Sequence, residues 1–282
     1  MNTISLLSAI VVLPPLSGLL VTLISNLKSV RSEIPGLLFH SVLPSPKLNM
    51  SHIHIDTFKS FLGKLEDKNF KAITLNNANK SQANKKCLIT FDDGFECVYR
   101  YALPLLEQFK QKMTVFCVSE FCNINSSWDI FSNQPHLSVS QIKEISDLGH
   151  EIGSHTATHA NLPFLNERDL RLELADSKHK LEDITGKEVS SISFPFGGWN
   201  QRIWHTALAL GYKSSTLYRN HSLKNSEQYP VYGVYRFDSA ESIIKRVSPP
   251  SILSHSHTIA TLMSHFSKGS PIWKFQKRYT KI

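Results

Sequence analysis

The chain has 282 residues, of which 41% are hydrophobic and 19% are charged, and this composition excludes a disordered chain. Its length suits one large α/β domain with a full core, and no internal repeat or low-complexity linker divides it. The formal net charge of +8 suggests an anionic surface nearby. We expect no nucleic-acid partner, because no stripe of interleaved basic and aromatic residues is present.

The four cysteines form no C-x-x-C pair, so the sequence offers neither a zinc ribbon nor a thioredoxin-like redox motif. Cys87 and Cys117 lie in or beside apolar, strand-like runs. A free cysteine in such a run behaves as a small hydrophobic residue, and we therefore expect both to pack in the core.

Both ends of the chain suggest contact with a membrane. Within residues 1–33, the stretch from Ile4 to Ile24 carries no charge and is close to the roughly twenty residues that a membrane span needs. Lys28 and Arg31 follow it, which by the positive-inside rule would keep the rest of the chain cytoplasmic. The tail, residues 248–282, ends in the basic and aromatic "PIWKFQKRYTKI", which suits an anionic membrane surface or, alternatively, a solvated helix or frayed end.

Between these ends, short apolar runs alternate with amphipathic stretches in a pattern that predicts strands and helices in turn. The expected strands are 36–42, 70–75, 86–91, 113–118, 150–155, 190–194 and the end of 200–217, and the expected helices are 56–65, 98–112, 138–149 with Ser140 as its N-cap, 166–187 and the start of 200–217. Such alternation predicts an α/β fold with a largely parallel sheet over residues 34–247, closed or partly closed into a barrel. In a barrel of this kind, functional side chains lie at the carboxyl ends of the strands.

Polar residues do follow several of these strands. Asp92, Asp93 and Gly94 directly follow the strand 86–91. Two adjacent carboxylates at the end of a buried strand need solvent, hydrogen bonds or a cation to stabilise their charge. The alternative is a plain Asp-Gly turn.

Two further strand ends carry groups that could take part in chemistry. His155 and His159 are four residues apart, a spacing that can present two imidazoles to one metal ion, although core histidines would also explain them. The loop from Pro195 to Gly198 could direct a backbone N–H into a site or form an ordinary turn. Three such strand ends, met in chain order, favour one shared site.

The motifs "TFDDG", "SHTATH" and "FPFGGW" resemble, in order and spacing, the first three signature motifs of the polysaccharide deacetylases. Members of this family are metal-dependent carbohydrate esterases with a distorted β/α barrel. The stretch before these motifs, from "LLFHSV" to "KAITL", is similar to the entry segment of the branch that includes exported poly-N-acetylglucosamine deacetylases. The resemblance extends from about Ile34 to Tyr218.

The resemblance implies specific roles for five residues. Asp93, His155 and His159 would hold one divalent ion, for which we expect Zn²⁺, with Co²⁺, Ni²⁺ and Fe²⁺ as alternatives. Asp92 would be the general base, and the backbone N–H of Phe196 would donate to the oxyanion of the reaction.

The sequence also departs from the family pattern. Many members have an arginine that orients the base two residues before the proline of the third motif, whereas this chain has Ser193. Asp92 would then need another partner, and Arg236 is a candidate unless it lies on a solvated rim. For the general acid, a Leu-x-His match indicates His255, with His257 and His40 as alternatives.

These observations predict an enzyme that removes N-acetyl groups from N-acetylated sugars of a surface or extracellular polysaccharide. We expect the protein to be associated with a membrane, and the resemblance implies the bacterial inner membrane. One alternative is a metal-dependent amidohydrolase that acts on a small non-sugar substrate, since one fold hosts many chemistries. Another is a catalytically weak carbohydrate-binding or assembly protein that keeps the metal site for structure.

Overall fold

The structure is a computed structural model, and it describes residues 34–45, 49–126, 133–218 and 227–247. The predicted apolar segment 1–33 and the tail 248–282, with His255 and His257, lie outside the described residues. Within the described ranges, no helix combines the length and the apolar character that crossing a bilayer requires.

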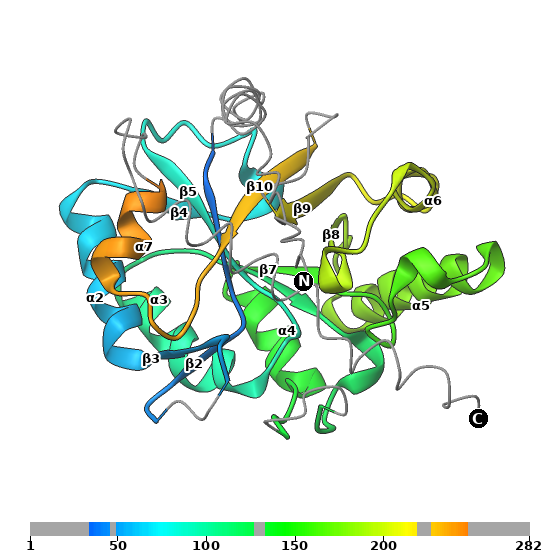
Figure 1. The fold of residues 1–282 in the computed structure, drawn as a ribbon, viewed down its shortest axis with the longest axis horizontal. Coiled ribbons are helices and arrows are strands. Elements are labelled where there is room, and N and C mark those ends of the chain that lie inside the picture. Colours follow the sequence, from blue (N-terminus) through cyan, green and yellow to red (C-terminus); the bar gives the residue numbers. More distant parts are fainter. Residues whose placement is uncertain (1–33, 46–48, 127–132, 219–226, 248–282) are drawn as a thin grey trace, which may run out of the picture. The chain divides into compact units, whose positions relative to one another are not determined.

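A parallel β-sheet that closes on itself forms the centre of the fold (Figure 1). The strands run in the order β1-β10-β9-β8-β7-β6-β5-β4, and a further pairing between β1 and β5 closes the ring. Strand β4 pairs with the amino-terminal half of β5, so seven strands make the ring itself. The strands are β1 (Gly36–Phe39), β4 (Lys71–Ile73), β5 (Lys86–Phe91), β6 (Thr114–Cys117), β7 (Glu151–Ser154), β8 (Ser191–Ser193), β9 (Ser214–Tyr218) and β10 (Gln228–Gly233).

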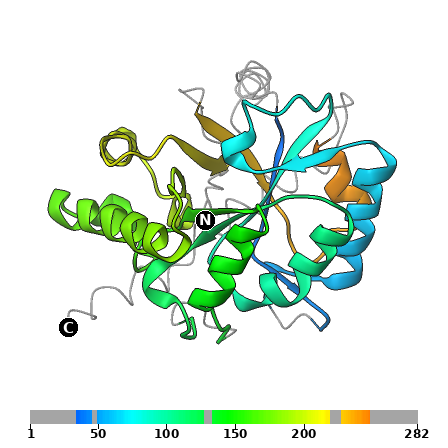
Figure 2. The same cartoon turned by 180° about the vertical axis from the view of Figure 1, so that it is seen from behind.

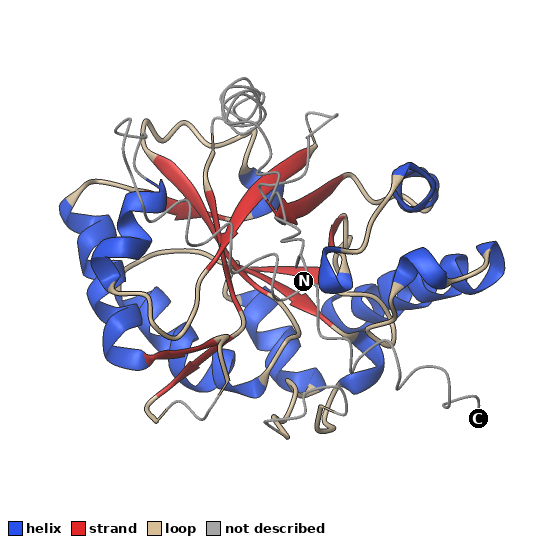
Figure 3. Ribbon diagram, viewed as in Figure 1, coloured by secondary structure: helices blue, strands red, loops and turns tan. Residues whose placement is uncertain are grey.

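The ring is a distorted β/α barrel, which confirms the predicted fold class. Its pairing is uneven: β7 meets β8 in a single register pair, Ser154 with Ile192, whereas β6 and β7 pair over four residues. Helices cover the strands from outside, with α2, α3 and α7 on one side and α5 and α6 on the other, as Figures 1 and 2 both show. Figure 3 separates the same helices and strands by colour.

The helices bury apolar faces against the barrel, as their sequence pattern predicts. In α2, Phe58, Phe61, Leu62 and Leu65 are each 0% exposed. The helices are α2 (Ile55–Asp67), α3 (Leu103–Gln108, preceded by the π-helical turn Val98–Ala102), α4 (Val139–Asp147), α5 (Glu167–Thr185), α6 (Gln201–Ala209) and α7 (Ala240–Val247), with short 3-10 turns at Leu75–Asn77, Ser119–Phe121, Leu162–Phe164 and Pro195–Gly197.

Side chains fill the inside of the barrel, and Gly153 in β7 makes room for them. A Cβ at this position would lie 2.5 Å from the Phe116 ring and 2.7 Å from Ser191 Oγ. No side chain larger than that of glycine fits here without moving its neighbours, so the barrel is a packed core and not a pore. Cys87 and Cys117 are buried free cysteines, as expected.

The structure differs from some of the local predictions. The predicted strand 36–42 is two strands, because the chain leaves the barrel after Phe39 and β2 (Ser41–Leu43) pairs with β3 (His52–His54) in a separate two-stranded sheet. Helix α7 was not predicted.

The N-cap of α4 is Ser138, not Ser140. Ser138 has an extended backbone, its Oγ accepts the N–H of Gln141, and the Gln141 side chain accepts the Ser138 N–H, which completes a capping box. Ser140 already lies inside the helix, where its side chain cannot cap the first turn.

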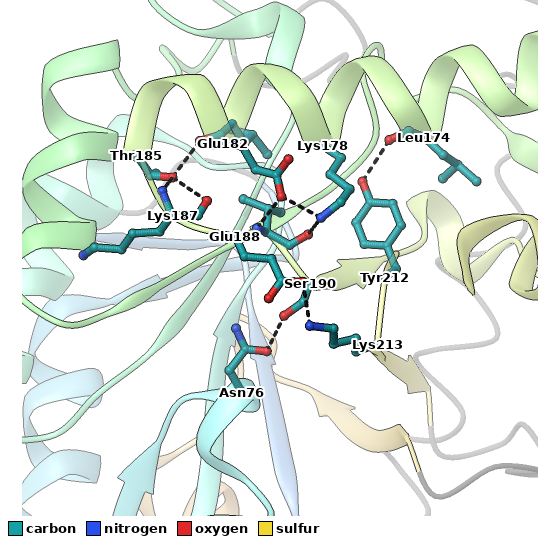
Figure 4. A network of polar contacts seen from close by, with 12 residues as sticks. Asn76, Leu174, Lys178, Glu182, Thr185, Lys187, Glu188, Ser190, Tyr212 and Lys213 are labelled. Carbon is teal, nitrogen blue, oxygen red and sulfur yellow. Dashed lines mark hydrogen bonds and ion pairs between the residues drawn. The ribbon is translucent and has the colours of Figure 1, made fainter. Parts of the chain in front are cut away.

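A buried lysine attaches the carboxyl-terminal half of α5 to the segment before β8 (Figure 4). Lys178 is 9% exposed, and its Nζ donates to Glu182 Oε1 and to the Val189 carbonyl oxygen, each at 2.6 Å. The ammonium also lies 5.6 Å from the centroid of the Tyr212 ring, whose hydroxyl donates to the Leu174 carbonyl oxygen. These contacts fix α5 beside β8 and β9, and therefore help to place the end of β8.

We predict that Lys178→Ala lowers the free energy of unfolding by about 1–3 kcal/mol, because it leaves a buried carbonyl and a partly buried carboxylate without their charged donor. Lys180→Ala is the matched control: Lys180 is on the same helix, and its ion pair with Glu120 is exposed. Denaturant unfolding of both variants measures the difference. Equal losses in the two variants would contradict the role of the buried network.

His150, just before β7, is a buried histidine held in its neutral form. Its Nδ1 accepts the Met113 N–H at 3.2 Å, and its Nε2–H donates to Glu107 Oε1 at 3.0 Å. Burial, together with the charge of Lys112, lowers the pKa of His150 to about 4, although Glu107 opposes the shift. The folded protein therefore resists a protonation that the unfolded chain accepts at about pH 6.5.

This contribution to stability is complete above pH 6.5 and should be lost as the pH falls towards 4. The unfolding free energy should fall by no more than about 1.4 kcal/mol per pH unit, the limit for one titrating group. We predict that His150→Asn, whose amide can replace the Nδ1 acceptor but cannot titrate, has a shallower decline in unfolding free energy over this range. His205→Asn, at an exposed position on α6, is the control and should keep the wild-type slope. An unchanged slope in His150→Asn would contradict the assignment.

Candidate active site and metal centre

The predicted site residues meet at one mouth of the barrel, where parallel strands present their carboxyl ends. Asp92 and Asp93 directly follow β5, His155 directly follows β7, and Phe196 lies in the loop after β8. These groups are far apart in sequence, and the closed parallel sheet is what brings them together.

Asp93, His155 and His159 form a compact, buried donor set. Asp93 Oδ1 lies 3.5 Å from His155 Nε2 and 3.3 Å from His159 Nε2. One donor atom from each residue lies within 4.8 Å of the other two, and all three residues are buried. One carboxylate and two imidazoles in this arrangement suit a divalent ion with positions left open for other ligands. The donor set therefore fits the ion that the resemblance implies.

The loop that carries both histidines is held from two sides. The His155 N–H donates to the Cys117 carbonyl oxygen at the end of β6, at 2.8 Å. On the other side, the N–H of Thr158 donates to the Glu173 carboxylate of α5 at 2.9 Å, and the Thr158 hydroxyl donates to the same carboxylate. The two imidazoles are therefore placed by neighbouring elements, a requirement for a preorganised site.

The backbone at the site adopts left-handed conformations that side chains usually avoid. The φ values are 69° at Asp93, 60° at His159 and 59° at Phe196. Gly94 follows with φ of 67°, and a Cβ there would lie 3.1 Å from Cys117 Cα. Strained residues of this type concentrate at functional sites, where the surrounding structure enforces them.

His155 has a fixed orientation and a fixed protonation state. Its Nδ1–H donates to the Ser193 carbonyl oxygen at 2.8 Å, which leaves Nε2 facing Asp93. Burial, followed by the charge of His159, lowers the pKa of His155 to about 3, although Asp93 opposes the shift. The imidazole is therefore neutral at physiological pH, as a metal ligand must be.

The two adjacent aspartates differ in their electrostatic surroundings. Burial, then the neighbouring charge of Asp93, raises the pKa of Asp92 well above its usual range, while a hydrogen bond from Ser193 lowers it in part. Burial would also raise the pKa of Asp93, but the hydrogen bond and charge of His159, with smaller effects of His40 and His155, outweigh it and lower that pKa. One carboxyl is thus a stable anion, while the other binds a proton more readily.

Ser193, the last residue of β8, contacts the base candidate directly. Its hydroxyl donates to Asp92 Oδ2 at 2.9 Å. The suggested partner of Asp92, Arg236, lies instead in the loop after β10, where its backbone N–H donates to the Met50 carbonyl oxygen. Sequence reasoning saw Ser193 only as a departure from the family pattern, because a serine in an apolar strand carries no signal of its own.

Phe196 lies against the metal-ligand candidates. Its ring packs edge-on against the His159 ring, with centroids 4.6 Å apart and planes at 73°. The turn around it is closed by the N–H groups of Gly197 and Gly198, which donate to the carbonyl oxygens of Phe194 and Pro195. The loop therefore places the side chain of Phe196 beside the donor set, and the role of its backbone N–H stays a prediction.

Two further histidines lie near the donor set. His40, between β1 and β2, affects the pKa of both Asp93 and His155 through its charge, and therefore lies near the site. Of the three candidates for the general acid, it is the one within the described residues. His136 was not predicted: it is 4% exposed, and burial lowers its pKa, although a hydrogen bond with the Ile124 carbonyl oxygen and the charge of Asp93 oppose the shift. It belongs to an irregular segment that pairs with Phe95, which no local pattern indicates.

The site lies within a region of the chain that matches a known protein family. The sequence model of the polysaccharide deacetylase family matches residues 79–215, which include the motifs that carry Asp92, Asp93, His155, His159 and Phe196. Residues 79–215 therefore form a domain of the polysaccharide deacetylase family.

The chain is also similar to curated relatives. It is 28% identical over 188 residues to YxkH of Bacillus subtilis, a protein named after the same family, and the match covers 64% of this chain and 63% of that protein. It is 31% identical over 133 residues to a peptidoglycan-N-acetylglucosamine deacetylase of Bacillus cereus, covering 46% of this chain and 56% of the relative. The chain therefore spans less than two thirds of the length of these relatives.

Solved structures share the fold. The deacetylase PplD of Streptococcus pyogenes superposes with a TM-score of 0.66 at 22% identity, over 79% of this chain and all of that one. IcaB of Ammonifex degensii superposes with a TM-score of 0.64 at 22% identity, over 77% of this chain and 97% of that one. At this identity the likeness establishes the barrel and leaves the chemistry to the residues of the site.

We predict that His155→Ala together with His159→Ala abolishes binding of a divalent ion, because a single carboxylate remains of the donor set. The measurement is metal content after loading with Zn²⁺ and dialysis, with the unfolding temperature as a check on the fold. His179→Ala, at an exposed position on α5, is the control and should bind as the wild type does. One retained ion per chain in the double variant would show that the donor set lies elsewhere.

Proposed function

We propose that this protein is a metal-dependent deacetylase that hydrolyses N-acetyl groups of a polysaccharide. The observation that carries the proposal is a second buried carboxylate, Asp92, directly beside a donor set for a divalent ion at the barrel mouth. A metal site kept only for structure would not need this carboxylate, whose burial is costly.

The residues of the site divide the chemistry among them. A divalent ion held by Asp93, His155 and His159 would lower the pKa of a water molecule and polarise the acetamide carbonyl. Asp92 takes the proton of the attacking water, for which its raised pKa suits it. The Phe196 N–H donates to the oxygen that becomes negatively charged as the carbonyl is attacked.

The substrate class follows from the family and from one relative. The Bacillus cereus relative is named for the deacetylation of N-acetylglucosamine in peptidoglycan. We infer an N-acetylated sugar polymer of the cell surface or its surroundings as the substrate of this chain. Zn²⁺ is the ion we expect, because one carboxylate and two imidazoles suit it.

Acetate release by the zinc-loaded protein tests this function. The substrates are chitin oligomers, peptidoglycan and a small non-sugar acetamide. Release from the sugars supports the proposal. Release from the small acetamide alone would indicate an amidohydrolase, and sugar binding without release would indicate a binding or assembly protein.

We further predict that Asp92→Asn keeps stoichiometric metal and lowers kcat by about a hundredfold or more, because the amide has the shape of the carboxylate but accepts no proton. Asp93→Asn should weaken metal binding itself, since Asp93 is the one anionic donor in the set. Metal titration and acetate release measure the two effects separately.

Asp176→Asn, at an exposed position on α5, is the control and should change neither quantity. Equal loss of metal in the Asp92 and Asp93 variants, or full activity in both, would show that the two aspartates do not have separate roles.

A further inference from the structure

We propose that Ser193 is the positioning residue for Asp92, and that its hydroxyl decides which carboxylate oxygen receives the proton. This inference rests on the proposed function, in which Asp92 is the general base.

The contact is short, buried and specific to one oxygen. Ser193 Oγ donates to Asp92 Oδ2 at 2.9 Å, and the residues are 4% and 5% exposed. The other oxygen, Asp92 Oδ1, is buried and accepts no hydrogen bond from any residue in the described part of the chain. Because the hydroxyl has a single proton to donate, it holds Oδ2 and leaves Oδ1 to accept a proton.

The same residue also orients a metal-ligand candidate, but through its main chain. The Ser193 carbonyl oxygen accepts the His155 Nδ1–H at 2.8 Å. The end of β8 therefore holds the base with a side chain and the ligand with a backbone group. A substitution at Ser193 changes the first contact and keeps the second, so the two effects can be measured apart.

The strand gives this serine a fixed position. Ser193 pairs with Thr216 of β9, and the preceding Ile192 pairs with both Ser154 of β7 and Ser215 of β9. With its backbone held in the sheet, the side chain has one torsion to set, so little conformational entropy is lost in forming the bond. The hydroxyl is thus preorganised for Asp92 before any substrate binds.

The matched variants Ser193→Thr and Ser193→Val test the proposal, because they have nearly the same shape and differ in the hydroxyl. We expect Ser193→Val to lower kcat for acetate release by roughly tenfold to a hundredfold, the effect of losing a hydrogen bond to a charged group, with KM little changed. Ser193→Thr should recover most of the wild-type kcat. Ser193→Ala, which adds no bulk, should behave like Ser193→Val.

Metal content and the unfolding temperature distinguish positioning from a structural role. Metal content should be the same in Ser193→Thr and Ser193→Val, and so should the unfolding temperature, because both variants keep the backbone carbonyl that accepts the His155 Nδ1–H. Loss of metal in Ser193→Val, wild-type kcat in that variant, or equal loss of kcat in both variants would overturn the proposal.

Crystal structures of the two variants provide a test that needs no activity. We expect the Asp92 carboxylate to keep its orientation in Ser193→Thr and to rotate in Ser193→Val, while Asp93 and His155 stay in place. An Asp92 carboxylate that does not move in Ser193→Val would refute the positioning role. If the wild type released no acetate, the proposed function would fail, and these structures would still decide the role of Ser193.

Discussion

The organisation of the site depends on the cost of burying two adjacent carboxylates. Asp92 and Asp93 are 5% and 7% exposed, and two like charges so close together cannot both remain ionised without compensation. The protein compensates them differently. Two imidazole nitrogens face Asp93, and one hydroxyl donates to Asp92. A divalent ion in the donor set would add the positive charge that favours ionisation of both.

This solution requires that three strand ends and one loop be held in place. The histidine loop is attached to the end of β6 and to α5, and β8 supplies both the hydroxyl for Asp92 and the carbonyl for His155. In turn, the Lys178 network keeps α5 beside the segment that leads into β8. These polar contacts connect helix α5 to β8, and β8 to the residues of the site.

Some of the positively charged side chains form hydrogen bonds within the protein. Lysines donate to main-chain carbonyl oxygens at or near the carboxyl ends of helices: Lys85 to Lys68 beside α2, Lys71 to Lys110 beyond α3, and Lys112 and Lys187 to Leu148 and Ser146 at α4. Such carbonyls lack partners within the helix, and cations suit the negative end of the helix dipole. These lysines explain part of the net charge of +8 without an anionic partner.

The sequence by itself determined the alternation of strands and helices, the α/β barrel and the family. Apolar periodicity and the three motifs are local patterns, and they can be recognised along the chain without the structure. It also indicated the five candidate site residues, since each motif directly follows a strand. Only the tertiary structure decided how these residues contact one another: that Ser193 and not Arg236 bonds Asp92, that His136 lies near the donor set, and that residues 41–43 leave the barrel. These contacts join segments up to 101 residues apart, and such pairings depend on how the ring of strands closes, which no local pattern records.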